Sequence, residues 1–128
     1  MDISQNISIP TLRQDLQIHP GSHDFDGSPT WMIYDPISDN YFKIGWFEFE
    51  CLQRLERVKT SAELAEVVSN ETSLSIDNDD VVEFIMFLAN AGFLQANTAE
   101  IRKVLEDIAT GKKKSLLHTL FLNYIFIK

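Results

Sequence analysis

Residues 26–54 constrain the fold of this chain more than any other segment. Two short aromatic runs, residues 31–34 and 41–44, flank a turn of sequence Asp35-Pro36-Ile37-Ser38-Asp39-Asn40. Apolar runs on either side of such a turn predict a β-hairpin. An isolated hairpin is only marginally stable, so it needs a packing partner. The amphipathic helix predicted to begin near Trp46 is the nearest candidate.

The rest of the chain predicts one more strand and further helices. Residues 16–18 form a short strand, and Leu74 and Ile76 form a brief extended bridge. The first helix spans residues 46–55, and a capping-box pattern at residues 60–63 opens the second. The third helix spans residues 79–91 and ends at Gly92, and residues 97–100 cap a fourth. The expected fold class is therefore α+β: an antiparallel sheet of about three strands, a three-helix winged-helix-like bundle and two C-terminal helical segments.

Apolar residues cover more than one side of the third predicted helix. Val81, Phe84, Ile85 and Leu88 form one face, while Val82, Met86 and Ala89 form a second. Such a helix must be covered on more than one side. It either lies at the centre of the bundle or lines a groove for a partner.

The chain divides into three predicted regions. Residues 1–11 are a flexible leader, residues 12–96 form the folded domain, and residues 97–128 form a helical extension toward a membrane. The extension contains Lys112-Lys113-Lys114 followed by an apolar, aromatic run. This combination is typical either of a solvated linker or of a segment near anionic headgroups. The chain stops within that pattern, which favours a piece of a longer protein.

Charge argues against nucleic acid as a partner. The 128 residues carry a net charge of −8. Residues 1–98 hold 5 basic and 16 acidic side chains, whereas residues 99–128 hold 6 and 3. Because binding to nucleic acid depends on Lys and Arg neutralising phosphates, DNA binding by a winged helix is disfavoured. The one cysteine, Cys51, excludes an internal disulfide and fits a reducing compartment.

No motif for covalent chemistry is present, so we expect no enzyme, no catalytic residue and no cofactor. His19 and His23 lie near Asp24 and Asp26, but in a Pro/Gly loop without metal-ligand spacing. The run from Asp77 to Asp80 lacks the glycine and distal glutamate of a calcium loop. Helix capping explains these acidic residues, and no metal site is predicted.

Several short blocks of sequence resemble a known family. The resemblance covers about residues 9–128, and its most specific part is residues 26–50. The matching blocks are Leu12-Arg13 with Asp15-Leu16, His19-Pro20-Gly21, Asp26-Gly27-Ser28-Pro29-Thr30-Trp31, Asp35-Pro36, Tyr41-Phe42 with Ile44-Gly45-Trp46, and Glu48-Phe49-Glu50. They look like the N-terminal segment of bacterial membrane proteins that are peptide zinc metalloproteases of the site-2 protease type, found beside HlyD-like export adaptors.

This resemblance implies a fold and a kind of partner. The segment is similar to PqqD, the peptide-recognition element of precursor-peptide systems, in which three strands precede a winged-helix bundle. There a leader peptide adds beside the third strand and lies against the third helix. The resemblance therefore implies a precursor or export-substrate peptide as partner, an HlyD-like export protein as a possible second partner, and a place at the cytoplasmic face of the inner membrane. The family's zinc motif and membrane spans are absent, so protease activity is not carried over.

The leading hypothesis is a non-catalytic peptide-docking domain of a membrane-bound protease or export protein. A small sheet leaves one edge open, and an open edge can receive an added strand. The predicted peptide-binding residues are Tyr41, Phe42, Lys43, Ile44, Val82, Glu83 and Met86. The backbone of residues 41–44 would pair with the peptide, Val82 and Met86 would form an apolar floor, and Lys43 and Glu83 would select its charge.

The alternative is a structural domain that helps the larger membrane protein assemble and has no peptide ligand. In that case the sheet edge would be covered by the N-terminal leader, by the C-terminal helices or by a second copy. The sequence leaves both possibilities open.

Overall fold

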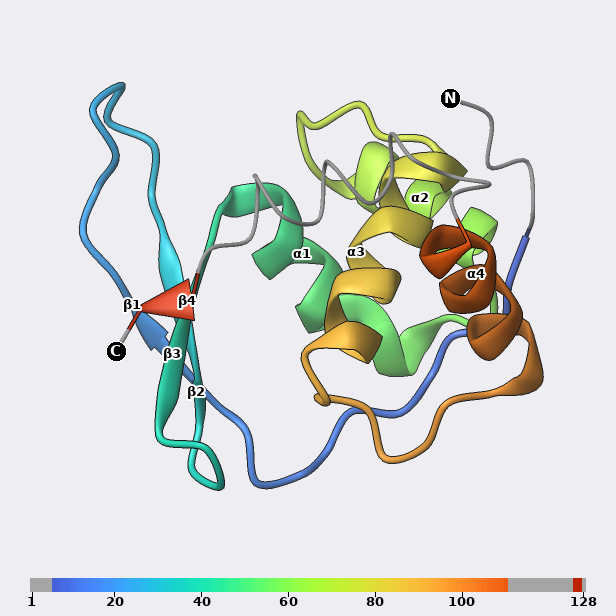
Figure 1. Ribbon diagram of the computed structural model, residues 1–128. Coiled ribbons are helices and arrows are strands. Elements are labelled where there is room, and N and C mark those ends of the chain that lie inside the picture. The colour runs from blue at the N-terminus through green and yellow to red at the C-terminus, as the bar shows by residue number, and fades with distance from the viewer. Residues whose placement is uncertain (1–5, 111–125, 128) are drawn as a thin grey trace.

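The computed structural model describes residues 6–110 and 126–127. A small antiparallel sheet lies beside a bundle of helices (Figure 1). The α+β class is confirmed. The elements, in chain order, are β1 (Gln17–Pro20), β2 (Trp31–Asp35), β3 (Asn40–Ile44), α1 (Trp46–Arg54), the 3-10 turn η1 (Leu55–Arg57), α2 (Ser61–Glu71), α3 (Asn78–Asn90), α4 (Ala99–Ala109) and β4 (Phe126–Ile127).

The predicted hairpin is confirmed as β2 and β3. The two strands pair antiparallel, with Tyr34 opposite Tyr41 and Ile33 opposite Phe42. In the turn between them, Asp39 adopts a positive φ of 56°, a conformation that Asp and Asn tolerate better than bulkier residues. β1 pairs antiparallel with the other side of β2, so the described sheet has the order β1-β2-β3-β4.

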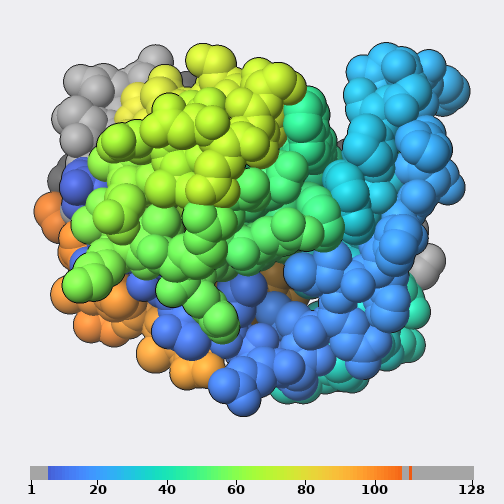
Figure 2. Space-filling model, turned by 180° about the vertical axis from the view of Figure 1, so that it is seen from behind, coloured from blue at the N-terminus to red at the C-terminus, as the bar shows by residue number. Residues whose placement is uncertain are grey.

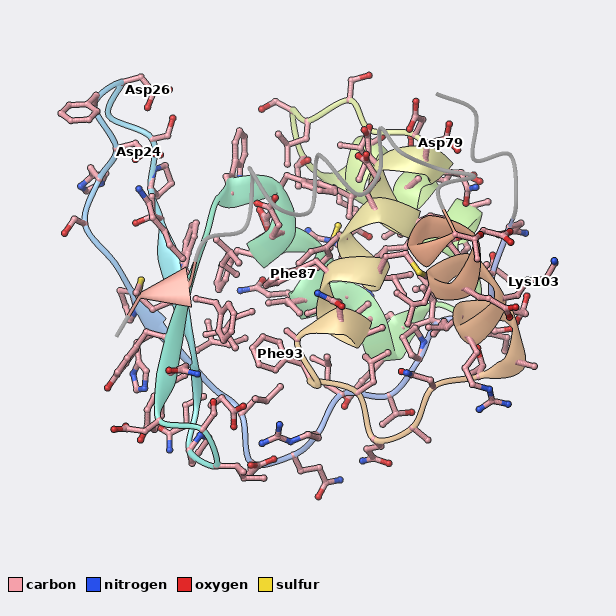
Figure 3. All side chains as sticks on the ribbon, viewed as in Figure 1. Asp24, Asp26, Asp79, Phe87, Phe93 and Lys103 are labelled. Atoms are coloured by element: carbon pink, nitrogen blue, oxygen red, sulfur yellow. The ribbon has the colours of Figure 1, made fainter. Side chains whose placement is uncertain are left out.

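Aromatic side chains join the sheet to the helices. Trp31 of β2 stacks on Phe49 of α1 with ring centroids 3.8 Å apart. Phe42 of β3 meets Phe93 edge-on at 4.9 Å, and Phe93 meets Phe87 at 6.0 Å. Figure 3 shows the labelled Phe87 and Phe93 between the sheet and the bundle. The partner predicted for the hairpin is therefore present, and it includes α3 as well as α1.

The predicted helix ends are confirmed by hydrogen bonds. The Thr60 hydroxyl accepts from the Glu63 backbone N–H, which caps α2. Asp77 and Asp80 each accept from the other's backbone N–H at the start of α3. Gly92 follows α3 with φ of +78°, a conformation that side chains with a Cβ rarely adopt. Capping therefore accounts for these acidic residues, as the sequence indicated.

Helix α3 lies at the centre of the bundle. Seven of its side chains from Val81 to Leu88 are at most 5% exposed. It packs against α2 on one side and α4 on another. Of the two interpretations of this two-sided apolar helix, the central position is the observed one.

The predicted flexible leader is wrong for residues 6–11. Ile7 is fully buried, and its carbonyl accepts from the Ser61 N–H while its own N–H donates to the Ser61 hydroxyl. Ile9 N–H donates to the Lys59 carbonyl, and Thr11 carbonyl accepts from Gln95 N–H. These bonds join the segment to residues 59, 61 and 95, which are distant in sequence, so a local pattern cannot indicate them.

The structure also differs from the predictions for residues 74–76 and for the end of the C-terminal extension. Leu74 and Ile76 do not form a strand, because the Ser69 hydroxyl satisfies both the N–H and the carbonyl of Ile76. The predicted C-terminal extension is helical in α4, and its last described residues, Phe126 and Ile127, are a strand. The Lys112–Lys114 run and most of the second C-terminal helical segment fall in residues 111–125, outside the described residues. No helix in the described part of the chain is long and apolar enough to cross a membrane.

The buried position of Ile7 generates a stability prediction. Ile7→Ala removes a fully buried side chain and leaves a cavity, so the free energy of unfolding should fall by about 2–4 kcal/mol in urea denaturation. The control is Ile37→Ala, because Ile37 is 79% exposed and should change that free energy by less than about 0.5 kcal/mol. Equal values for the two variants would contradict the packing of this segment.

Candidate functional site

The candidate site begins with the outer edge of β3. Backbone groups in antiparallel strands point alternately to one neighbour and to the other. Gly21 N–H donates to the Thr30 carbonyl, which sets this alternation across β1 and β2. The β2–β3 register extends the same alternation to β3. The backbone N–H and carbonyl of Phe42 therefore point toward β2, and those of Tyr41 and Lys43 point away from it. Those outward groups are the ones that an added strand would meet.

The expectation that this edge is open is wrong where β4 lies. β4 pairs antiparallel with β3, with Tyr41 opposite Ile127 and Phe42 opposite Phe126. β4 comes from the C-terminal end of the chain (Figure 1), so the sequence around β3 does not predict this pairing. The edge therefore already receives an extended segment, and within the described residues that segment is two residues long.

The four predicted residues of β3 divide between the two faces of the sheet. Ile44 is 2% exposed, and Phe42 contacts Phe87 and Phe93. Tyr41 is 37% exposed and lies against Tyr34 on the other face, with ring centroids 4.6 Å apart. Phe42 and Ile44 thus anchor the strand, whereas Tyr41 and Lys43 are accessible to a partner.

Lys43 already has an acidic partner. Its Nζ lies 2.6 Å from Oδ1 of Asp24, a residue of the loop between β1 and β2 (Asp24 is labelled in Figure 3). Both side chains are close to half exposed, so solvent screens the pair and it contributes little to stability. Lys43 can exchange Asp24 for a carboxylate on a ligand, which keeps it a candidate for charge selection.

The predicted apolar floor is not on the surface. Val82 and Met86 are both fully buried, because α3 is the central helix of the bundle. Glu83, the third predicted α3 residue, is half-buried. A strand added to β3 would therefore meet neither Val82 nor Met86 in this conformation, and the described site is smaller than the sequence predicted.

An ion-paired hub that the sequence analysis did not identify holds the hairpin in place. Arg13 donates to Asp15, to the buried Asp35 and to the Gly92 carbonyl after α3. Asp35 also accepts from the Ile37 N–H and the Ser38 hydroxyl. The spacing Arg-x-Asp and the turn aspartate were visible in the sequence, but nothing there linked them across the fold.

The hub shifts the acidity of Asp35. Hydrogen bonds from Arg13 are the largest cause that lowers the pKa of Asp35, to about 2, and burial opposes them. Ser38 and Ile37 add smaller contributions that also lower this pKa. Hydrogen bonds from Arg13 likewise lower the pKa of Asp15. Asp35 is therefore ionised at all ordinary pH values and serves as a structural acceptor.

No catalytic constellation is visible in the described residues. Cys51 is fully buried, and desolvation raises the pKa of its thiol far above the usual range, so it is not a nucleophile under ordinary conditions. Within residues 6–110 and 126–127, no group of three or more His, Cys, Asp or Glu side chains could hold a metal ion. Glu48 accepts from the Gly45 N–H, and Glu50 accepts from Trp46 and Arg54.

Comparison with known proteins does not extend this description. No family model, no curated protein and no solved structure matches the chain. The candidate site is therefore defined by the strand pairing, burial and ion pairs described above.

The Arg13–Asp35 contact generates a prediction about pH. The pKa of Asp35 is lower in the folded chain than its ordinary value of 3.8, so its stabilisation is present above about pH 4 and is lost as the pH falls toward 2. Asp35→Asn should therefore flatten the dependence of the free energy of unfolding on pH between 4 and 2, measured by urea denaturation at each pH.

Glu71 supplies the matched control. Its pKa is also lowered to about 2, by Arg57 and Arg54, and its ion pairs do not include Arg13. Asp35→Asn and Glu71→Gln should each remove part of the pH slope, and the double variant should remove the sum of both parts. An unchanged slope in Asp35→Asn would contradict the ion pair.

Proposed function

We propose that this chain is a non-catalytic peptide-docking domain that receives an extended peptide as a strand beside β3. One observation carries the proposal: the outer edge of β3 already pairs with an extended segment, residues Phe126–Ile127. The edge is therefore geometrically able to accept a strand. The resemblance to precursor-recognition elements supports the same position, with a precursor or export-substrate peptide as the ligand.

Within the described residues, the present occupant is only two residues long. Within the described residues β4 covers Tyr41 and Phe42 only. Backbone groups alternate along the ladder, and of the two covered residues it is Tyr41 whose groups face β4. The described part of this pairing therefore holds at most two backbone hydrogen bonds. Each contributes about 1 kcal/mol net. A peptide that pairs with the outward backbone of both Tyr41 and Lys43 would form about twice as many bonds as the described part of β4.

The proposed site is therefore revised from the sequence prediction. The backbones of Tyr41 and Lys43 supply donors and acceptors, and the Tyr41 side chain and the Lys43 ammonium supply contacts on the exposed face. Phe42 and Ile44 position the strand from within. Val82 and Met86 belong to the buried core and do not contact the peptide. The proposal assigns Glu83 no contact with the peptide.

A second candidate function rests on the same pairing, because an edge covered by the chain itself is what the structural alternative predicts. If β4 closes the edge permanently, the chain is a structural domain of a larger membrane protein and has no peptide ligand. The two functions differ in whether a peptide added in trans can take the place of β4.

The test uses the chain's own strand as a probe. A variant that lacks residues 125–128 is titrated with the synthetic peptide of residues 123–128, NYIFIK, and backbone amide shifts are followed by NMR. We expect saturable shifts centred on residues 41–43, and weaker binding to the full chain, because its own β4 competes. The same titration with candidate precursor peptides encoded near the gene then identifies the ligand.

Two variants at one position separate backbone pairing from side-chain contact. Lys43→Pro removes an outward N–H without breaking the β2–β3 ladder, whereas Lys43→Ala keeps that N–H and removes the ammonium. Lys43→Pro should weaken binding of the peptide by about tenfold, corresponding to one lost hydrogen bond. Lys43→Ala should weaken binding by about threefold or less. A truncated chain that binds no peptide would favour the structural function instead.

A further inference from the structure

A recess on the opposite side of the molecule from β4 has no assigned role. Viewed from behind, the N-terminal segment runs below the surface formed by α1, η1 and α2, with a hollow between them (Figure 2). The hollow is a cavity of about 610 Å³ between residues 9–14 and residues 52–58. This volume lies within the range of about 300–1,000 Å³ that is typical of ligand sites.

The recess has an apolar floor. Ile9, Leu12, Leu52, Leu55 and Val58 line it, and Leu52 and Leu12 also line a smaller adjoining cavity beneath β1. Ile18 of β1 lines that second cavity and is 41% exposed. The apolar surface therefore continues from α1 to the edge of the sheet.

The rim offers hydrogen-bond acceptors that are not in use. Gln14, Gln53 and Glu56 line the larger cavity and are exposed. Within the described part of the chain, no hydrogen bond or ion pair engages any of the three side chains. Two amide oxygens and one carboxylate can thus accept hydrogen bonds from a ligand.

Two ionised side chains line the recess, Arg13 and Glu56. Arg13 contributes one positive charge, but Asp15 and Asp35 already engage it. Glu56 has no such cationic partner within the described residues, and the nearby Arg57 is paired with Glu71. A cationic ligand is therefore favoured over an anionic one.

The edge of β1 adds backbone groups to the same surface. Within the described residues, β1 has no neighbour on its outer side. The alternation set by the Gly21–Thr30 bond turns the N–H and carbonyl of Ile18 outward, together with the carbonyl of Pro20. Pro20 has no N–H, so an added strand could pair over only a few residues. The edge suits a short contact and resists open-ended pairing.

We propose that this recess binds a short extended segment of a partner polypeptide in which an apolar residue and an arginine lie two positions apart. Residues two apart in a strand lie on one face, so both side chains can enter the recess. The apolar residue contacts the floor at Leu52 and Ile18. The guanidinium reaches Glu56 and the amide oxygens of Gln14 and Gln53, because its five donors match several acceptors.

The test is a titration of the full chain with two five-residue peptides, Ac-SLTRS-NH2 and Ac-SLTES-NH2, followed by backbone amide shifts. The arginine peptide should cause saturable shifts at Ile18, Gln53 and Glu56, and added salt should weaken its binding. The glutamate peptide should bind at least about fivefold more weakly. This site is independent of the one proposed on β3, whose occupation would be reported by residues 41–43.

Two charge reversals provide the matched comparison. Glu56→Lys should lower the affinity for the arginine peptide by about fivefold or more. Glu66→Lys makes the same change in net charge on an exposed position of α2 outside the recess, and should change that affinity by less than about twofold. Equal losses in the two variants, equal binding of the two peptides, shifts confined to β3, or no saturable binding at millimolar peptide would each overturn the proposal.

Discussion

The contact between β3 and the helical bundle determines most of what this molecule can present to a partner. Phe42 packs edge-on against Phe93 and contacts Phe87, and Ile44 is buried beside it. Because strand side chains alternate with a period of two, burying these residues turns Tyr41 and Lys43 to the other face. Backbone direction alternates with the same period, so the outward hydrogen-bonding groups also belong to Tyr41 and Lys43. A slip of one residue would reverse both properties at once.

The two edges of the sheet differ in their capacity to pair with an added strand. The β3 edge has no proline and already pairs with β4, whereas the β1 edge contains Pro20 and has no neighbour among the described residues. Proline limits how far a ladder can grow. A longer added strand is therefore compatible with β3, and only a short contact is compatible with β1. The two proposed binding surfaces follow this difference.

Much of the fold could be predicted because its signals are local. The turn between residues 35 and 40, the Thr60 cap, the Asp77–Asp80 capping pair and the stop at Gly92 each depend on neighbours within a few residues. Less of the candidate site could be predicted. Tyr41 to Ile44 form the expected strand, but Val82 and Met86 are buried, and the β3 edge is partly covered. A pattern of apolar residues marks a helix face that must be covered, without indicating whether the cover is a partner or the chain itself.

By itself, the sequence determined the main elements from β1 to α4, their order and the two-sided apolar character of the third helix, because propensity, capping and periodicity act over one or two turns. Only the tertiary structure decided which segments meet. It buried Ile7 against Ser61, joined Arg13 to Asp35 and Gly92, and brought β4 beside β3. These contacts join residues between about 20 and 90 positions apart, and their free energy comes from burial and from the pairing of polar groups that the folded shape alone brings together.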